Sequence, residues 1–341
     1  MFLRLLKWLL VWLSLPGASH SAPADAPRLG PFEKPHPREL GIPQEDEHFS
    51  AYEALNGSFS SPGQCSQISD ALWVEVEGRG ECIRFYAEGL EESGNQEVLV
   101  YFGGDVILRT SWGVRFIASS YFRQSPARLH AEMAAWSQQA GRPAIYLARP
   151  GTYGSSGDHN LRRYPREVAL VDRALDMIKA RYRIASFILA GQSGGGHIAA
   201  SLLNRRQDIA AMVISSGLVS VKRAMAYWDR RWKIPARLLY DAREFYDPID
   251  DIGGIRADPP PSIYVISDPE DQTVPFFSQL HYVRRLRAAG FKPQHIYARA
   301  LDRRRHVLAR QGKLVAAMLA RGADMKNIRR MLMELDLKTM Q

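Results

Sequence analysis

Cysteine is scarce in this chain of 341 residues, which contains only Cys65 and Cys82. Two thiols are too few for a disulfide-dense scaffold, and they make a poor set of metal ligands. The hydrophobic content of 46% is instead ample for a conventional core. We therefore predict a fold that needs no metal, and we expect no cofactor.

A concentrated basic surface is also lacking. The formal net charge of +9 is modest for this length, and arginine and lysine are spread along the chain. The densest groups are Arg230, Arg231 and Lys233, and the three arginines at 303–305. A nucleic-acid-binding protein would be expected to carry a basic stripe or a known binding module. We therefore predict no nucleic-acid partner.

Long apolar runs are absent after the first 24 residues, and roughly 20 such residues are needed to cross a bilayer. Residues 1–24 have the form of a signal peptide, because Arg4 and Lys7 precede a short apolar run that small residues follow. We expect cleavage near 22–24, with 19–21 as the alternative, and an uncleaved signal anchor is the other option. The mature chain is thus predicted to be periplasmic or secreted, without a stable membrane span.

Export changes the expectation for the two cysteines. In an oxidising compartment, two cysteines indicate one disulfide. We therefore predict a bond between Cys65 and Cys82. This bond would tie the segment before the first strand to the second strand.

The distribution of apolar residues predicts the order of the elements. Residues 25–65 are rich in Pro, Gly, Glu and His and show little periodicity, which indicates an irregular N-terminal leader. Residues 71–89 alternate between apolar and polar side chains around a Gly-Arg-Gly turn, the pattern of a β-hairpin. Runs that are apolar throughout, as a parallel sheet covered by helices requires, follow at 97–105, 142–151, 185–193, 210–217 and 261–268, with a weaker one at 294–302.

Segments with helical periodicity separate these runs. The alternation predicts an α/β domain over 66–322, with a mostly parallel central sheet, an N-terminal antiparallel hairpin and helices on both faces. The interval 218–260 is too long for a simple crossover, and we predict a small helical cap insertion there. Residues 323–341 are expected to form a C-terminal helical tail.

One motif with a chemical meaning stands between a predicted strand and a predicted helix. Gly191-Gln192-Ser193-Gly194-Gly195 has the form G-x-S-x-G. A chain that lifts a serine above a sheet has to turn sharply, so the residues two before and two after it must be small. The N–H of Gly194, at the start of the helix, is then placed to donate to an oxyanion. The alternative is a structural turn with a bystander serine.

A nucleophilic serine requires an acid and a base. The strand that ends at Asp268 is followed by Glu270 and Asp271, at the sheet edge where α/β folds place catalytic groups. We favour Asp271 as the acid because it begins a D-x-x-V-P turn, and we expect Asp268 to cap the loop. A solvated acidic loop is the alternative for all three.

The base is expected beyond Asp271 in the chain, where three histidines stand. His281 falls inside a predicted helix, and His295 begins a predicted strand. His306 follows the last strand and opens the last helix, so a loop can bring its imidazole over Ser193. We therefore predict His306 as the base.

Two further sets of residues complete the predicted site. The glycine pair in "YFGGD" (101–105) suggests a second oxyanion donor, and Phe102, Gly104 and Asp105 are all candidates. Tight-turn glycines without a function are the alternative. Substrate-pocket candidates, which are equally well explained as core residues of the cap or of a helix, are Tyr153, Trp228, Trp232 and His197.

Taken in this order, the motifs resemble the α/β-hydrolase superfamily over about residues 70–320. G-x-S-x-G-G looks like the prolyl-oligopeptidase and dienelactone-hydrolase branches. The resemblance implies Ser193 as nucleophile, Asp271 as orienting acid and His306 as base, with the Gly194 N–H in the oxyanion hole. The chain departs from the pattern at 303–305, where arginines stand in place of small residues before the histidine.

These features predict an exported serine hydrolase that acts on a small-molecule or acylated substrate. We expect cleavage of a carboxylic ester, or of a thioester or amide, through an acyl-enzyme. A peptidase of the prolyl-oligopeptidase type is the first alternative. A non-catalytic binding protein on a degenerate hydrolase fold is the second, and the three arginines motivate it.

Overall fold

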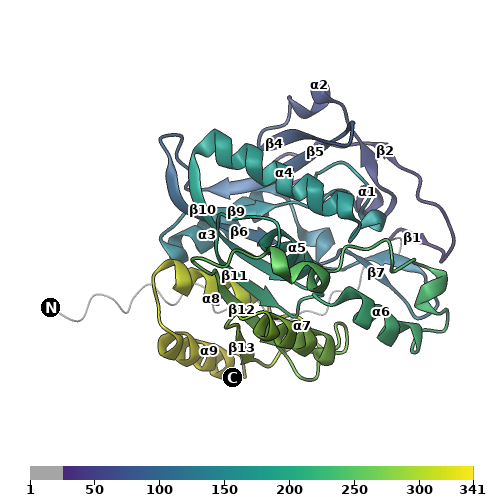
Figure 1. Ribbon diagram of the computed structural model, residues 1–341. Coiled ribbons are helices and arrows are strands. Elements are labelled where there is room, and N and C mark those ends of the chain that lie inside the picture. The colour runs from purple at the N-terminus through teal and green to yellow at the C-terminus, as the bar shows by residue number, and fades with distance from the viewer. Residues whose placement is uncertain (1–25, 341) are drawn as a thin grey trace.

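The computed structural model (Figure 1) describes residues 26–340, with side chains through residue 335. The predicted signal peptide, residues 1–24, lies outside this range. The central sheet has the strand order β13-β12-β11-β10-β6-β9-β5-β4. Its strands are β4 (Ala71–Val76), β5 (Arg79–Glu88), β6 (Asn95–Phe102), β9 (Ala144–Leu147), β10 (Ile184–Gln192), β11 (Ile209–Ser215), β12 (Ser262–Ser267) and β13 (Gln294–Tyr297).

The pairing of the strands follows the predicted pattern. β4 and β5 form the antiparallel hairpin, and β5 also pairs antiparallel with β9. The remaining neighbouring pairs are parallel: β9 with β6, β6 with β10, β10 with β11, β11 with β12, and β12 with β13. The mostly parallel sheet with an antiparallel hairpin at one edge is thus confirmed.

Helices cover both faces of this sheet (Figure 1). On one face, α3 (Pro126–Ala140) packs on β5 and β9, and α8 (Ala309–Ala320) packs on β10 and β11. On the other face lie α4 (Pro165–Tyr182), α5 (Gly194–Leu203) and α7 (Phe276–Ala288). Burial on both faces explains why the central strands carry runs of apolar side chains, such as 98–102 in β6 and 187–190 in β10.

Local signals set the two ends of α3. α3 begins where the hydroxyl of Ser125 accepts a hydrogen bond from the N–H of Arg128, with Pro126 in the first turn. It ends at Gly141, which has a left-handed backbone with φ of 64°. The predicted range 126–141 therefore matches the helix closely.

The segment 25–65, which was expected to be irregular, contains short regular elements. They are β1 (Arg28–Leu29), β2 (Arg38–Glu39), α1 (Ala51–Asn56), β3 (Ser58–Phe59) and α2 (Pro62–Cys65). Phe49 and Leu55 are buried in the core beside the sheet, which holds the segment on the body of the protein. Cys65 and Cys82 form the predicted disulfide, which joins α2 to β5.

The long interval between β11 and β12 contains α6 (Val221–Asp229) and two 3₁₀ helices, η3 (Ala236–Leu238) and η4 (Pro248–Gly254). We call residues 218–260 the cap segment. The last helix, α9 (Met325–Met340), packs against α8 through the buried Ile328 and Leu332. Within residues 26–340, no helix is both long and apolar enough to cross a membrane.

Short elements at 107–123 and 159–161 connect the early strands to the helices. The strands β7 (Ile107–Arg109) and β8 (Arg115–Ile117) form a small antiparallel sheet with β1. The 3₁₀ helices η1 (Tyr121–Arg123) and η2 (His159–Leu161) precede α3 and α4, respectively.

The parallel register gathers the ends of four strands at one edge of the sheet. Gly191 of β10 pairs with Phe102 of β6, and Gln192 pairs with Ser215 of β11. Ser215 in turn pairs with Ile266 of β12. Because open α/β sheets bind ligands beyond the carboxyl ends of their strands, this edge is where the candidate site is expected.

Candidate active site

Ser193 occupies a strained turn between β10 and α5. Its φ of 55° and ψ of −116° lie far from the backbone conformations that non-glycine residues prefer. Conformations of this kind cost about 1–3 kcal/mol and persist only where the surroundings enforce them. Here the Ser193 N–H donates to the carbonyl of Ser215, and its own carbonyl accepts from the N–H of Leu218. The neighbouring strand end therefore holds the turn in place.

The glycines on either side of Ser193 are required by close backbone contacts. A Cβ at Gly191 would lie 2.3 Å from the carbonyl oxygen of Gly195. A Cβ at Gly195 would lie 2.0 Å from the carbonyl oxygen of Phe102. The smallest side chain is thus excluded at both positions, as the steric argument from the motif predicted.

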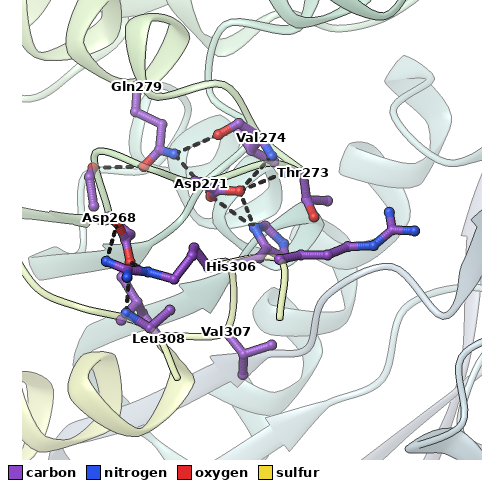
Figure 2. A network of polar contacts seen from close by, with 12 residues as sticks. Asp268, Asp271, Thr273, Val274, Gln279, His306, Val307 and Leu308 are labelled. Carbon is purple, nitrogen blue, oxygen red and sulfur yellow. Dashed lines mark hydrogen bonds and ion pairs between the residues drawn. The ribbon is translucent and has the colours of Figure 1, made fainter. Parts of the chain in front are cut away.

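Asp271 and His306 are in direct contact in the loops that follow β12 and β13 (Figure 2). The Nδ1 atom of His306 lies 2.9 Å from Oδ2 and 3.1 Å from Oδ1 of Asp271. A carboxylate can only accept, so Nδ1 carries the proton and Nε2 is left as an acceptor. The carboxylate itself is fully buried, and the imidazole is 12% exposed.

The carboxylate of Asp271 is held by donors from its own turn. Oδ1 accepts hydrogen bonds from the backbone N–H groups of Thr273 at 2.8 Å and Val274 at 2.9 Å (Figure 2). These donors come from the D-x-x-V-P turn that identified Asp271 in the sequence. They fix the direction in which the carboxylate faces His306.

We call residues 298–308, between β13 and α8, the histidine loop and residues 191–195 the serine turn. The side chain of Gln192 connects the two. Its amide nitrogen donates to the carbonyl of His306 at 3.0 Å, and its Oε1 accepts from the N–H of Leu308 at 3.1 Å. The hydroxyl of Ser215 also donates to Oε1 at 2.9 Å. Gln192, the residue before Ser193, therefore anchors the backbone on both sides of Val307, the residue that follows His306.

Asp268 fastens the same loop from the other side. It is fully buried and accepts from the N–H groups of Glu270 and Ala300 at 2.9 and 2.8 Å. The guanidinium of Arg305 donates to both its oxygens, at 2.7 and 3.2 Å. Asp268 thus caps the loop, as its position in the sequence predicted. The departure at 303–305 is explained in part, because Arg305 is an ion-pair partner within the loop.

We expect Arg305→Leu to destabilise the protein by about 2 kcal/mol at pH 7, because it leaves the buried Asp268 carboxylate without its cation. Burial raises the pKa of Asp268, but hydrogen bonds from Arg305 and two backbone N–H groups outweigh burial and lower it. The wild-type pair therefore contributes stability above the unfolded pKa of about 4 and loses it as the pH falls further.

Urea unfolding at pH 7 and pH 4 measures this effect. The difference between wild type and Arg305→Leu should shrink at pH 4, because protonation neutralises the unpaired carboxylate of the variant. Arg304→Leu is the matched control, since its side chain is exposed. Equal destabilisation by the two variants would contradict the ion-pair explanation.

The remaining acid and base candidates lie in other surroundings. Glu270 is exposed and forms an ion pair with Arg305 at 3.3 Å. His281 lies in α7, within the helix that was predicted. His295 is the second residue of β13 and lies next to Ser267, and burial lowers its pKa to about 4. The structure brings neither of these histidines against Asp271.

A buried chain of hydrogen bonds runs from His295 to Asp271 through Gln279. His295 Nε2 lies 3.1 Å from the hydroxyl of Ser267, which donates to Gln279 Oε1 at 2.7 Å. The amide nitrogen of Gln279 donates to the Val274 carbonyl at 3.0 Å and to Asp271 Oδ2 at 3.4 Å (Figure 2). The reverse amide orientation would set its oxygen against two acceptors, so the direction of the chain is fixed.

Replacing Gln279 with leucine should therefore lower kcat about tenfold while KM stays within a factor of two. The side chain contacts the candidate acid Asp271, and small misplacements of a catalytic group reduce its rate contribution. Steady-state kinetics on a 4-nitrophenyl ester gives both constants. Ser278→Ala, which alters a buried side chain one position away on the same helix, should leave kcat unchanged, and an equal loss there would argue for a general packing defect.

The structure brings the loop after β6 against the serine turn. A Cβ on Gly104 would lie 3.4 Å from Cβ of Ser193, so the backbone of Gly104 borders the serine. Phe102 is fully buried, and its carbonyl oxygen is directed at Gly195. Gly194 is the first residue of α5, where backbone N–H groups have no partner within the helix. The backbone of Gly104 and that of Gly194 thus lie beside Ser193, and Asp105 stays a candidate for the second donor.

The aromatic residues that were predicted to line the pocket belong to two aromatic groups. Trp228 and Trp232 stack on each other in the cap segment at a centroid distance of 5.6 Å, and the Trp228 ring N–H donates to the carbonyl of Thr273 next to the acid. Tyr153 packs against Tyr121 in an aromatic cluster beside the sheet.

His197 is not accessible to a substrate. It is fully buried, and its Nε2 lies 2.8 Å from the carbonyl of Tyr246. Burial lowers its pKa to about 4, which keeps the ring neutral. Its place on α5 four residues after Ser193 directs it into the protein interior, so the expectation that it borders the pocket is corrected.

The side chains that hold the histidine loop were not predicted from the sequence. Gln192 stood inside the motif, but its role depends on contact with a segment 114 residues away. The arginines at 303–305 departed from the family pattern, but this departure did not indicate that Arg305 pairs with Asp268. Gln279 gave no signal, because its contacts arise from the approach of α7 to the loop after β12.

The scan of protein families found no matching model, and the search of curated proteins found no relative. Solved structures do match. The acylaminoacyl peptidase of Pyrococcus horikoshii superposes with a TM-score of 0.50 and 12% identity, over 76% of this chain and 43% of the peptidase. Prolyl oligopeptidase B of Galerina marginata gives a TM-score of 0.50 and 13% identity, over 73% and 35%.

The Pyrococcus furiosus esterase Pf2001 is similar in size, with a TM-score of 0.48 and 13% identity, over 76% of this chain and 88% of the esterase. This chain spans less than half the length of the acylaminoacyl peptidase and of prolyl oligopeptidase B. Identities at this level establish the architecture alone. Together with the strand order and the helices on both faces, they show that the chain has the α/β-hydrolase fold.

Proposed function

We propose that this protein is a serine hydrolase that cleaves carboxylic esters through an acyl-enzyme. The observation that carries the proposal is the buried Asp271–His306 hydrogen bond, whose loop is tied by Gln192 to the strained turn of Ser193. A nucleophile and its base require this arrangement, in which a third group orients the base. Cys- and metal-based hydrolysis would require other side chains.

The geometry supports a two-stage reaction. Ser193 Oγ attacks the ester carbonyl carbon, and His306 Nε2 takes the hydroxyl proton while Nδ1–H remains bonded to Asp271. The carbon–oxygen bond to the alcohol then breaks, and the alcohol leaves with the proton from Nε2. Water repeats the sequence on the acyl-enzyme, which releases the carboxylic acid and restores the serine.

The negative charge of the tetrahedral intermediate is assigned to two backbone donors. The N–H of Gly194 lies at the positive end of α5, and Gly104 borders Ser193 from the loop after β6. Removing one such donor typically costs about 10²–10³ in kcat. Because both donors are backbone groups in fixed positions, they need not reorient as the negative charge develops.

The three arginines at 303–305 were the main reason to consider a non-catalytic binding protein. This reason is weakened because Arg305 is paired with Asp268 and stabilises the loop of His306. We also propose that the protein is exported, which agrees with the signal-like residues 1–24 and the disulfide.

Labelling with a fluorophosphonate probe tests the proposal without altering the protein. The purified chain should react with one equivalent of probe, and mass spectrometry of the digest should place the adduct on Ser193. Heat-denatured protein is the control and should remain unlabelled, because only the folded site activates the hydroxyl. An adduct on another serine, or none with an active probe, would overturn the proposed function.

A further inference from the structure

A second polar cluster surrounds the carboxylate of Asp105, in the loop that follows β6. Arg149 Nη1 donates to Oδ1 at 2.8 Å and Arg162 Nε to Oδ2 at 3.2 Å, and Arg163 Nη2 contacts Oδ2 as well. The three arginine side chains are at most 7% exposed. A Cβ on Gly194 would lie 2.0 Å from Asp105 Oδ1. The cluster therefore adjoins the residue that follows the proposed nucleophile.

Positive charge exceeds negative charge in this cluster. Among the side chains of residues 26–335, Glu167 is the other carboxylate that forms an ion pair in the cluster, with Arg149 at 2.8 Å. Burial raises the pKa of Asp105, yet Arg163, Arg149 and Arg162 together hold it well below its usual range. The Nε atom of Arg163 is buried and has no hydrogen-bond partner among the residues that the structure describes. One guanidinium therefore exceeds what the two carboxylates neutralise.

Arg109 and Tyr240 extend the cluster toward the cap segment. Arg109 Nε donates to the phenol oxygen of Tyr240 at 2.8 Å, and its guanidinium lies 4.7 Å from the centre of the ring. Burial raises the pKa of Tyr240, but Arg162, Arg109 and Arg163 outweigh burial and lower it. The charges of these three guanidiniums thus favour the ionised phenol. A hydrogen bond of 3.4 Å from Arg162 Nη2 to the carbonyl of Ile107 joins β7, which carries Arg109, to the cluster.

Arg109 differs from the other arginines of the cluster in its partners. Within residues 26–335 it forms no ion pair with a carboxylate, and its contacts are the phenol and the carbonyl of Gly113 at 2.8 Å. It is only partly buried, whereas Arg149, Arg162 and Arg163 are buried. Tyr240 uses its oxygen as an acceptor and keeps its O–H as a donor.

Buried guanidiniums without matching anions are costly, and the cost is offset when an anion binds them. The planar guanidinium and the phenol O–H offer the donors that a carboxylate accepts. We propose that Arg109, Arg163 and Tyr240 form a subsite for an anionic group of the substrate, beside the serine turn. For its catalytic consequence this inference rests on the proposed function: the preferred esters carry a negative charge.

Paired esters test the subsite. Mono-4-nitrophenyl esters of the dicarboxylic acids from succinate to suberate are compared with neutral 4-nitrophenyl esters of equal chain length. At the best chain length, Arg109→Gln should lower kcat/KM for the charged ester about tenfold and leave the neutral ester within a factor of two. Tyr240→Phe keeps the ring and should shift the ratio in the same direction. Equal changes for both esters in both variants would overturn the subsite.

Arg230→Gln is the matched control. It removes the same charge from an exposed position at the end of α6, so it should not change the ratio of charged to neutral ester. If it lowers the ratio as much as Arg109→Gln does, the preference comes from the general charge of the protein and the subsite is rejected.

Binding without turnover separates the subsite from the proposed function. The dicarboxylates from succinate to suberate are each added to Ser193→Ala. At least one of them should raise the melting temperature, and the double variant Ser193→Ala/Arg109→Gln should lose this shift. If no ester is hydrolysed by wild type but the Arg109-dependent shift is present, the proposed function fails and the subsite stands. If esters are hydrolysed but no dicarboxylate shifts the melting temperature, the subsite fails and the hydrolase stands.

Discussion

Replacing Ser193 with alanine is expected to lower kcat for 4-nitrophenyl esters by about a million-fold, to the rate that oxyanion donors and substrate binding alone provide. The turn that holds Ser193 is made by backbone contacts to Ser215 and Leu218, so the fold should not depend on the hydroxyl. The loss would therefore be chemical. Steady-state kinetics together with the melting temperature of the variant measures both parts of this expectation.

A second variant shows whether the serine and the histidine act as one unit. His306→Ala alone should be nearly as slow as Ser193→Ala, and the double variant should be no slower than either, because groups in one relay are strongly non-additive. Ser201→Ala is the control, since its buried hydroxyl lies on the same helix and bonds to the carbonyl of His197. Additive losses in the double variant would mean that His306 does not serve Ser193.

The fold was predictable because its signals are local. Continuous apolar runs marked β6, β9, β10, β11 and β12, and helical periodicity marked the helices between them. Residues 25–65 were not predicted as regular because their elements are two to six residues long. Such short segments carry too few positions to show a period, and their order comes from packing on the sheet.

The candidate site was predictable only where the backbone imposes a sequence requirement. The serine turn requires small residues at 191 and 195. The turn that begins at Asp271 requires a side chain that accepts a hydrogen bond from the backbone N–H two residues later. The contacts of Gln192, Gln279 and Arg305 join segments that are far apart in the chain, and any polar residue of suitable length fits the sequence pattern. His197 was misplaced because helical spacing gives its distance from Ser193 but not which face of α5 is buried.

Gly195→Ala is expected to be the most disruptive single-atom addition at the site. The new methyl group would lie 2.0 Å from the carbonyl oxygen of Phe102 and 2.6 Å from that of Gly103. Both are backbone atoms at the end of β6, which cannot yield without moving the strand end. Overpacking typically costs about 1–3 kcal/mol, and this variant should lose at least that upper value in urea unfolding.

The same shift should reduce catalysis in the fraction that folds. Moving the strand end displaces Gly104 from Ser193, and a displacement of about 1 Å lowers kcat on the order of 100-fold. Gly196→Ala is the comparison one residue later, because its nearest neighbours are a methyl carbon of Ile214 at 2.8 Å and the Cα of Gly217 at 2.9 Å. That contact is less severe and includes a side chain that can adjust, so Gly196→Ala should cost less stability and retain most of its kcat. If Gly195→Ala proves as stable and as active as Gly196→Ala, the backbone at 102–104 is not fixed against the serine turn, and the oxyanion donor assigned to Gly104 loses its support.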